Sequence, residues 1–117
     1  GFRLEVVRRP IQPVLNRSER RSWRLHRKLS AHLTLGTFEQ WRPTIDRNLE
    51  RLRVRVSGQP HVRNLSRWEG LIEAGDVLGD QRVMTGLDRD SIEMREVSPM
   101  GGLLSQEERT AVLAASI

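Results

Sequence analysis

The amino-acid sequence predicts a mainly α fold, a small single-core bundle of about five helices with a short N-terminal strand or two-stranded ribbon as an added element. Capping-box patterns precede segments whose apolar residues recur every three or four positions, as in amphipathic helices. Only residues 2–7 alternate clearly in the manner of a strand. The length of 117 residues suits one domain, and we expect residues 1–117 to form a single domain.

The first helix is predicted over residues 17–33, after the strand-like segment and two prolines that end regular structure. Asn16 is followed three residues later by Glu19, the spacing at which two side chains satisfy each other's backbone amides at a helix start. We expect Gly36 to stop this helix.

The second predicted helix has the strongest periodic signal in the chain. Thr37 and Gln40 have capping-box spacing, and we expect Pro43 to cause either a kink or a short turn before a helix that starts there. Six apolar residues then fall within about 80° of each other on a helical projection. They are Phe38, Trp41, Ile45, Leu49, Leu52 and Val56.

Shorter elements are predicted in the rest of the chain. A third helix fits residues 64–74, and a fourth, short one is capped by Asp76. Asp90 and Glu93 have capping-box spacing before another short helix, although the alternation that follows also suits a strand paired with residues 2–7. A last helix follows Ser105. The expected core consists of Leu25, Leu29, Trp41, Ile45, Leu49, Leu52, Trp68 and Ile72.

Charge is divided unevenly along the chain. Residues 1–67 hold 16 basic and five acidic side chains, a net charge of +11, whereas residues 68–117 hold four basic and ten acidic ones, a net charge of −6. This asymmetry indicates an anionic partner for the basic half, or docking of one half on the other. Nineteen of the 20 basic residues are arginines, which suit phosphate recognition, although GC-rich codons also favour arginine over lysine.

The sharpest candidate site is the row Arg47, Arg51 and Arg55, which lies opposite the apolar face of the second predicted helix. Like charges at this spacing cost about 0.2–0.5 kcal/mol per pair, and a phosphate backbone or an acidic protein would relieve the repulsion. The alternative is a solvated arginine face. The chain's own acidic segment, residues 88–96, is another candidate to neutralise the row. It would cover the row within one chain or across a dimer.

A second candidate lies on the first predicted helix, where Trp23 stands among Arg20, Arg24 and Arg27. A tryptophan on a basic face stacks on nucleic-acid bases or on a partner's side chain. The alternative is that Trp23 packs under the N-terminal strand or the proline-rich connection that follows it, because a small domain rarely leaves this residue exposed.

Catalytic and metal signatures are lacking. The chain has no Cys, no zinc-binding histidine pattern, no nucleophile motif and no phosphate-binding glycine loop, so we expect neither a metal nor a cofactor. An enzyme remains open, because general acid–base sites leave no sequence trace. No apolar run approaches the length of a membrane span and no signal peptide is visible, so a cytoplasmic location is expected.

These observations lead to one principal hypothesis and one alternative. The principal hypothesis is a non-enzymatic module that binds nucleic acid with an arginine-rich face from the first two helices. The alternative is a protein-interaction or regulatory subunit, of the bacterial toxin–antitoxin or immunity type, whose basic face binds an acidic protein partner; association with a second copy is also open. An exposed Trp23 favours nucleic acid, whereas an apolar patch beside the arginine row favours a protein.

Overall fold

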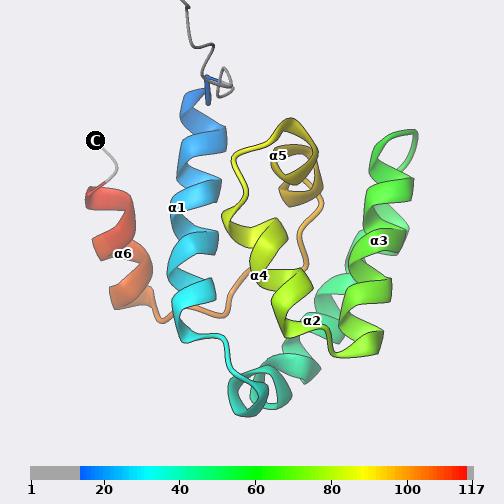
Figure 1. Ribbon diagram of the computed structural model, residues 1–117, viewed down its shortest axis with the longest axis horizontal. Coiled ribbons are helices and arrows are strands. Elements are labelled where there is room, and N and C mark those ends of the chain that lie inside the picture. The colour runs from blue at the N-terminus through cyan, green and yellow to red at the C-terminus, as the bar shows by residue number, and fades with distance from the viewer. Residues whose placement is uncertain (1–13, 116–117) are drawn as a thin grey trace, which may run out of the picture.

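The computed structural model describes residues 14–115, and this part of the chain forms six helices (Figure 1). They are α1 (Arg17–His32), α2 (Leu35–Arg55), α3 (His61–Ala74), α4 (Val77–Thr85), α5 (Arg89–Arg95) and α6 (Gln106–Ala114). The mainly α class is confirmed, with one helix more than the five expected. No strand occurs within residues 14–115, and the strand predicted over residues 2–7 lies outside the described range.

The start of α1 is the one that the sequence predicts. The Asn16 side chain accepts from the backbone N–H of Glu19 at 2.8 Å, and the Glu19 carboxylate accepts from the N–H of Asn16 at 3.0 Å. The predicted end near residue 33 is confirmed, but Gly36 is not the residue that stops this helix, because it lies within α2. The helix ends at the cap Leu33, and Thr34 at once caps α2 by accepting from the N–H of Thr37.

Helix α2 therefore begins before the Thr37 and Gln40 pattern. It also runs through Pro43 without interruption, so a turn before a separate helix at Pro43 is wrong. Proline removes one backbone donor from the helix. Burial of Phe38, Ile45 and Leu49 on one face of α2 supplies the stabilisation that keeps both sides of the proline helical.

The segment after Asp88 forms the helix α5 and not the alternative strand, and the residue that caps the helix differs from the expected one. The side chain of Asp88, and not that of Asp90, accepts from the N–H of Ser91 at 3.0 Å. Asp90 is unavailable for capping because its carboxylate binds the guanidinium of Arg67 on α3. By contrast, Asp76 at α4 and the Ser105 capping box at α6 are confirmed.

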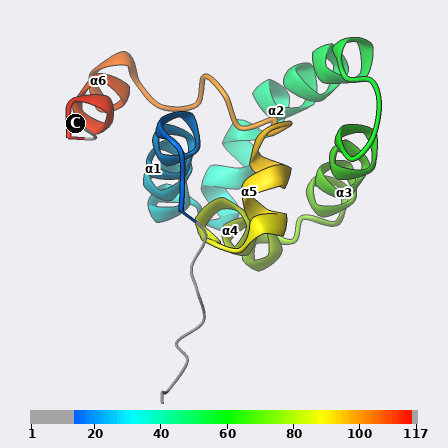
Figure 2. The ribbon, with the colours of Figure 1, turned by 90° about the horizontal axis from the view of Figure 1, so that it is seen from above.

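The helices are arranged around α4 and α5. Helix α1 packs on α4, α5 and α6, whereas α3 packs on α2, α4 and α5. Figure 2 shows α6 at one edge of the molecule beside α1, with α3 at the opposite edge. Helix α2 carries the chain from the end of α1 to the α3 side, so its later turns lie far from α1 (Figures 1 and 2).

The core contains most of the residues expected there. Five of them are buried: Leu29, Ile45, Leu49, Trp68 and Ile72. Trp41 and Leu52 are half-buried and pack against this core, and Leu25 is also half-buried. The later part of the chain adds four residues that were not expected in the core. These are Met84, Met94, Val97 and Met100. The indole N–H of fully buried Trp68 donates to the carbonyl of Met94 at 2.6 Å, which joins α3 to α5.

No helix within residues 14–115 is long and apolar enough to cross a membrane.

Candidate functional site

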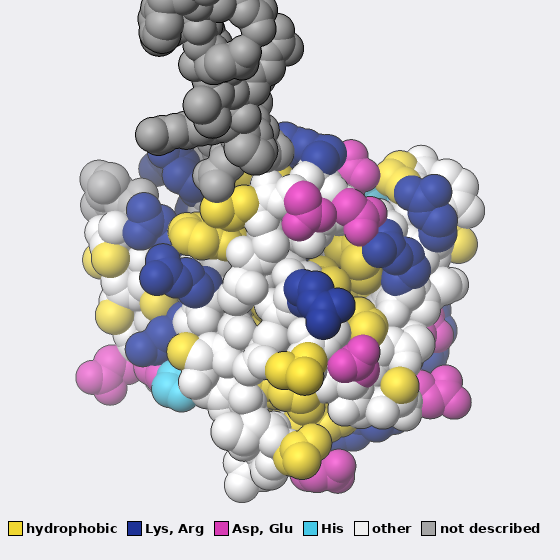
Figure 3. Space-filling view, viewed as in Figure 1, with side chains coloured by type: hydrophobic (Ala, Val, Ile, Leu, Met, Phe, Trp, Pro, Cys, Tyr) yellow, Lys and Arg dark blue, Asp and Glu magenta, His cyan; other side chains and the backbone are white. Residues whose placement is uncertain are grey.

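Helix α1 presents a continuous cationic face. At about 100° per residue, its six basic side chains fall within an arc of about 120°, and they extend about 17 Å along the helix axis. They are Arg17, Arg20, Arg21, Arg24, Arg27 and Lys28, and we call this set the α1 cationic face. Figure 3 shows basic side chains gathered in a column at the left of the molecule, over α1 and α6.

The positive charge of this face is not compensated by ion pairs within the described part of the chain. Within residues 14–115, none of the six basic groups forms an ion pair. The one acid of α1, Glu19, caps the helix and accepts from Arg89 of α5 at 2.8 Å. These hydrogen bonds, first that of the Asn16 backbone, hold the pKa of Glu19 below its usual value. No carboxylate that the structure describes therefore forms an ion pair with the α1 cationic face.

One member of the face is engaged by α6. A guanidinium nitrogen of Arg24, Nη1, donates to the carbonyl of Ala115 at 3.4 Å, and its Nε is buried without a partner. A shallow groove of about 280 Å³ runs between the two helices, lined by basic residues of α1 and by Val112 and Ala115. Arg24 therefore contacts the carboxyl end of a helix, where backbone carbonyls carry partial negative charge.

Trp23 lies at the edge of this face and is half-buried. Its indole N–H donates to the carbonyl of Thr85 at 3.0 Å, and the guanidinium of Arg27 lies 5.2 Å from the centre of its ring. The polar atom of the indole thus fastens α1 to the end of α4. Trp23 lies on the same helix as Arg20, Arg24 and Arg27, as the sequence suggested. Its N–H, however, is already hydrogen-bonded within the fold.

The second predicted site, the Arg47, Arg51 and Arg55 row, lies on the exposed face of α2. Arg47 donates to the hydroxyl of Thr44 at 3.1 Å, and Arg51 hydrogen-bonds the side-chain oxygen of Asn48. No member of the row forms an ion pair within residues 14–115. The row therefore remains uncompensated, as expected from the sequence.

An exposed apolar side chain lies beside this row. Val54 is 88% exposed and lines a shallow depression on α2 together with the three arginines and Glu50. This α2 depression and the α1 cationic face are separate surfaces, because α2 leads away from α1 (Figure 2). Helical periodicity placed each set on its own helix correctly, but it contained no information on how the two helices lie in space.

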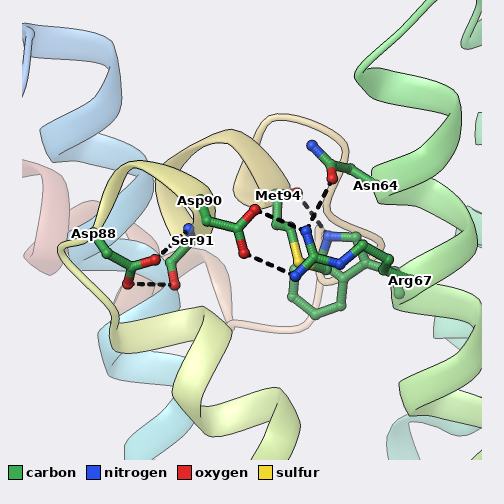
Figure 4. A network of polar contacts seen from close by, with 7 residues as sticks. Asn64, Arg67, Asp88, Asp90, Ser91 and Met94 are labelled. Atoms are coloured by element: carbon green, nitrogen blue, oxygen red, sulfur yellow. Dashed lines mark hydrogen bonds and ion pairs between the residues drawn. The ribbon is translucent and has the colours of Figure 1, made fainter.

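The acidic strip of residues 88–96 does not cover the arginine row. Asp90 forms a two-pronged ion pair with Arg67 of α3, with both N–O distances 2.8 Å, and Asp88 caps α5 (Figure 4). Glu96 lies 4.0 Å from His61. The expected contact within one chain is wrong, since α3 provides the closest cation to Asp90 and the guanidinium lowers the pKa of that carboxyl.

A cleft of about 530 Å³ lies between α3, α4 and α5. Most of its ionisable lining groups are already bound: Arg67 to Asp90, Asp88 to Ser91, and Asp76 to the backbone at the start of α4. The first of these contacts joins α3 to α5, and the other two cap α5 and α4. The cleft therefore contributes to the fold, and it presents no set of free polar groups aimed at a ligand.

His26 and Ser98 form the closest approach to a catalytic pair. The hydroxyl of Ser98 lies 2.7 Å from Nε2 of His26, and Nδ1 lies 2.7 Å from the carbonyl of Ser22. Burial lowers the pKa of His26 to about 4, which makes it a weak base at neutral pH. Pro99 follows Ser98 and supplies no backbone N–H that could stabilise an oxyanion. The hydrogen bond between Ser98 and His26 links α1 to the segment after α5.

Neither a metal centre nor a relative guides the assignment further. No group of three or more His, Asp or Glu residues within residues 14–115 is placed to hold a metal ion. No protein-family description, characterised protein or solved structure matches this chain. The α1 cationic face and the α2 depression are therefore the two candidate sites. Sequence reasoning missed Arg17, Arg21 and Lys28 as site residues, although a projection of the basic residues alone would have found them.

Proposed function

We propose that the protein binds nucleic acid through the α1 cationic face. The supporting observation is that six basic side chains share one side of α1 and none is paired with a carboxylate within residues 14–115. Five of the six are arginines, whose planar guanidinium groups match phosphate oxygens in a two-pronged geometry. A phosphate backbone relieves the repulsion among these charges and releases its own condensed counterions.

Binding of this kind depends on backbone phosphates and not on base sequence. In this mode the basic side chains of the face contact phosphates, which every sequence carries, so affinity should be similar for unrelated sequences. Because each neutralised phosphate contributes a slope of about −0.9 on duplex DNA, the affinity should fall steeply as salt concentration rises.

Fluorescence anisotropy with a labelled 20-base-pair DNA duplex and its RNA counterpart tests this proposal. The test variant is Arg20→Gln, Arg21→Gln, Lys28→Gln, which removes three exposed charges that form no ion pair within residues 14–115. We expect a loss of affinity of at least about tenfold and a salt slope that is shallower by up to about three units.

The matched control also removes three exposed charges, but from outside the α1 cationic face. It is Arg55→Gln, Arg63→Gln, Arg82→Gln, and it should retain most of the affinity. Equal losses in the two variants would mean that net charge alone attracts the nucleic acid. Absence of any binding by the wild-type protein at low salt would refute the proposal.

A second candidate function concerns the α2 depression, which we propose as a docking surface for an acidic protein. Here the exposed Val54 supports a protein partner, because protein interfaces combine an apolar centre with arginine-rich surroundings. Arg51 is also held in place: Asn48 binds it and in turn donates to the carbonyls of Pro99 and Gly101 at 2.8 and 2.9 Å. Such pre-ordering reduces the entropy lost on binding.

Quantitative co-purification after nuclease treatment tests this second candidate. Wild-type protein is compared with the variant Arg47→Gln, Arg51→Gln, Arg55→Gln and with the α1 variant described above. A protein that is retained by the wild type and by the α1 variant, and lost from the α2 variant, supports docking at this surface. If the two variants lose the same proteins, the α2 depression has no partner of its own.

A further inference from the structure

We propose that α6 is an intramolecular competitor for the nucleic acid, and that binding of a phosphate backbone to α1 displaces it. This inference rests on the proposed function of the α1 cationic face. In the structure the carboxyl end of α6 lies against Arg24, where the Ala115 carbonyl accepts a hydrogen bond that a phosphate oxygen would otherwise accept. The helix thus presents partial negative charge to the same guanidinium that the ligand needs.

The groove between α1 and α6 is the place where α6 and a phosphate backbone would compete. Arg24, Arg27 and Lys28 line one side, and Val112 and Ala115 of α6 line the other. A phosphate backbone that follows the basic side chains of α1 therefore meets α6 at Arg24. Arg24 is also half-buried with its Nε unpartnered, so contact with the α6 carbonyl leaves a donor unsatisfied that a phosphate can satisfy.

The attachment of α6 is weak enough to be reversed. No residue of the helix is buried, and it packs chiefly against α1. Its contacts with α1 include the long hydrogen bond of Arg24 and that of Glu108 with His32, the latter at 3.0 Å between two exposed side chains. Exposed pairs of this kind contribute little to stability. The caps of α6 are internal, because Ser105 and Glu108 bind each other, so the helix does not need α1 to satisfy its first turn.

The test uses the full chain and a variant without a change in charge. Ala111→Pro places a proline in the interior of α6, where it removes a backbone donor and disrupts the helix. Because α6 buries no residue, far-UV circular dichroism should show the loss of this helix alone. We expect the variant to bind the labelled 20-base-pair duplex about fivefold more tightly than the wild type, which corresponds to about 1 kcal/mol.

Two controls connect the gain to Arg24 and to displacement. In the Arg24→Gln background, Ala111→Pro should give no gain in affinity, because the shared guanidinium is missing. In the wild-type protein, hydrogen exchange should show that DNA protects the amides of α1 and increases exchange in those of α6.

The outcomes separate this inference from the function on which it rests. Tighter binding by Ala111→Pro together with faster exchange in α6 supports the competitor. Equal affinities, or protection of α6 by the DNA, overturn it and leave binding at α1 intact. If neither protein binds nucleic acid at low salt, the proposed function fails and the competitor with it.

Discussion

His26 of α1 accepts a hydrogen bond from the hydroxyl of Ser98, across 2.7 Å between Nε2 and Oγ. The direction follows from the other ring nitrogen. Nδ1 lies 2.7 Å from the carbonyl of Ser22, which only accepts, so in the neutral ring Nδ1 carries the proton and Nε2 is the acceptor. The backbone N–H of Met100 donates to the same hydroxyl at 3.1 Å, and together these bonds attach the segment after α5 to α1.

Removal of the Ser98 hydroxyl should therefore destabilise the fold. In Ser98→Ala the buried Nε2 of His26 loses its donor, at a cost of about 1–3 kcal/mol in the free energy of unfolding. Ser66→Ala, an exposed serine on α3, is the matched control and should change stability by less than about 0.5 kcal/mol. Urea denaturation measures both, and equal stabilities would show that the hydrogen bond contributes nothing.

Two buried groups should make opposite contributions to the pH dependence of stability. Burial lowers the pKa of His26 to about 4, so the unfolded chain binds the extra proton and this group makes stability rise with pH between about 4 and 6.5. Burial, with the charge of Asp76 adding to it, raises the pKa of Asp80 to about 7. The folded state then binds the extra proton, and this group makes stability fall between about pH 4 and 7.

Single variants should uncover these opposed slopes. Between pH 5 and 6.5 we expect stability to change little in the wild type, to rise by about 1.4 kcal/mol per pH unit in Asp80→Asn, and to fall by a similar amount in His26→Gln. Urea denaturation at half-unit pH intervals measures the slopes. Parallel curves for the three proteins would mean that neither group is buried as the structure has it.

Two helix glycines should respond oppositely to the same substitution. A Cβ at Gly70 of α3 meets no atom within 4 Å, so Gly70→Ala should stabilise the protein by about 0.5–1 kcal/mol through helix propensity. At Gly79 of α4 a Cβ would collide with the carboxylate of Asp76 and would lie 2.8 Å from the side chain of Leu71. Since that carboxylate caps α4, Gly79→Ala should destabilise the protein. Thermal denaturation should move the two midpoints in opposite directions.

Trp23 should act in the fold more than in binding. Trp23→Phe removes the donor to the Thr85 carbonyl and keeps an aromatic ring beside Arg27, so we expect a loss of about 0.5–1.5 kcal/mol in stability. The affinity for the labelled duplex should change by less than about twofold, because phosphate contacts come from the basic residues. A large loss of affinity at unchanged stability would instead assign Trp23 to base stacking.

Much of the secondary structure could be predicted because its causes are local. The capping boxes at Asn16 and Ser105 join residues three positions apart, so the sequence alone identified both helix starts. The same reasoning selected Asp90 for α5 and was wrong, since the competing partner, Arg67, is 23 residues away in the sequence. Spacing along the chain contains no information on such a contact.

For the candidate sites, too, some features depend on local spacing and others on tertiary packing. The sequence by itself determined that α1 and α2 each carry several arginines on one side, because the angle between side chains on a helix depends only on their separation along the chain. Only the tertiary structure decided that Arg24 contacts the end of α6, that Val54 is exposed beside Arg51, and that the two basic surfaces lie apart. Those relationships follow from the burial of apolar faces from several helices in one core, and that packing, not local spacing, sets the directions of α1, α2 and α6.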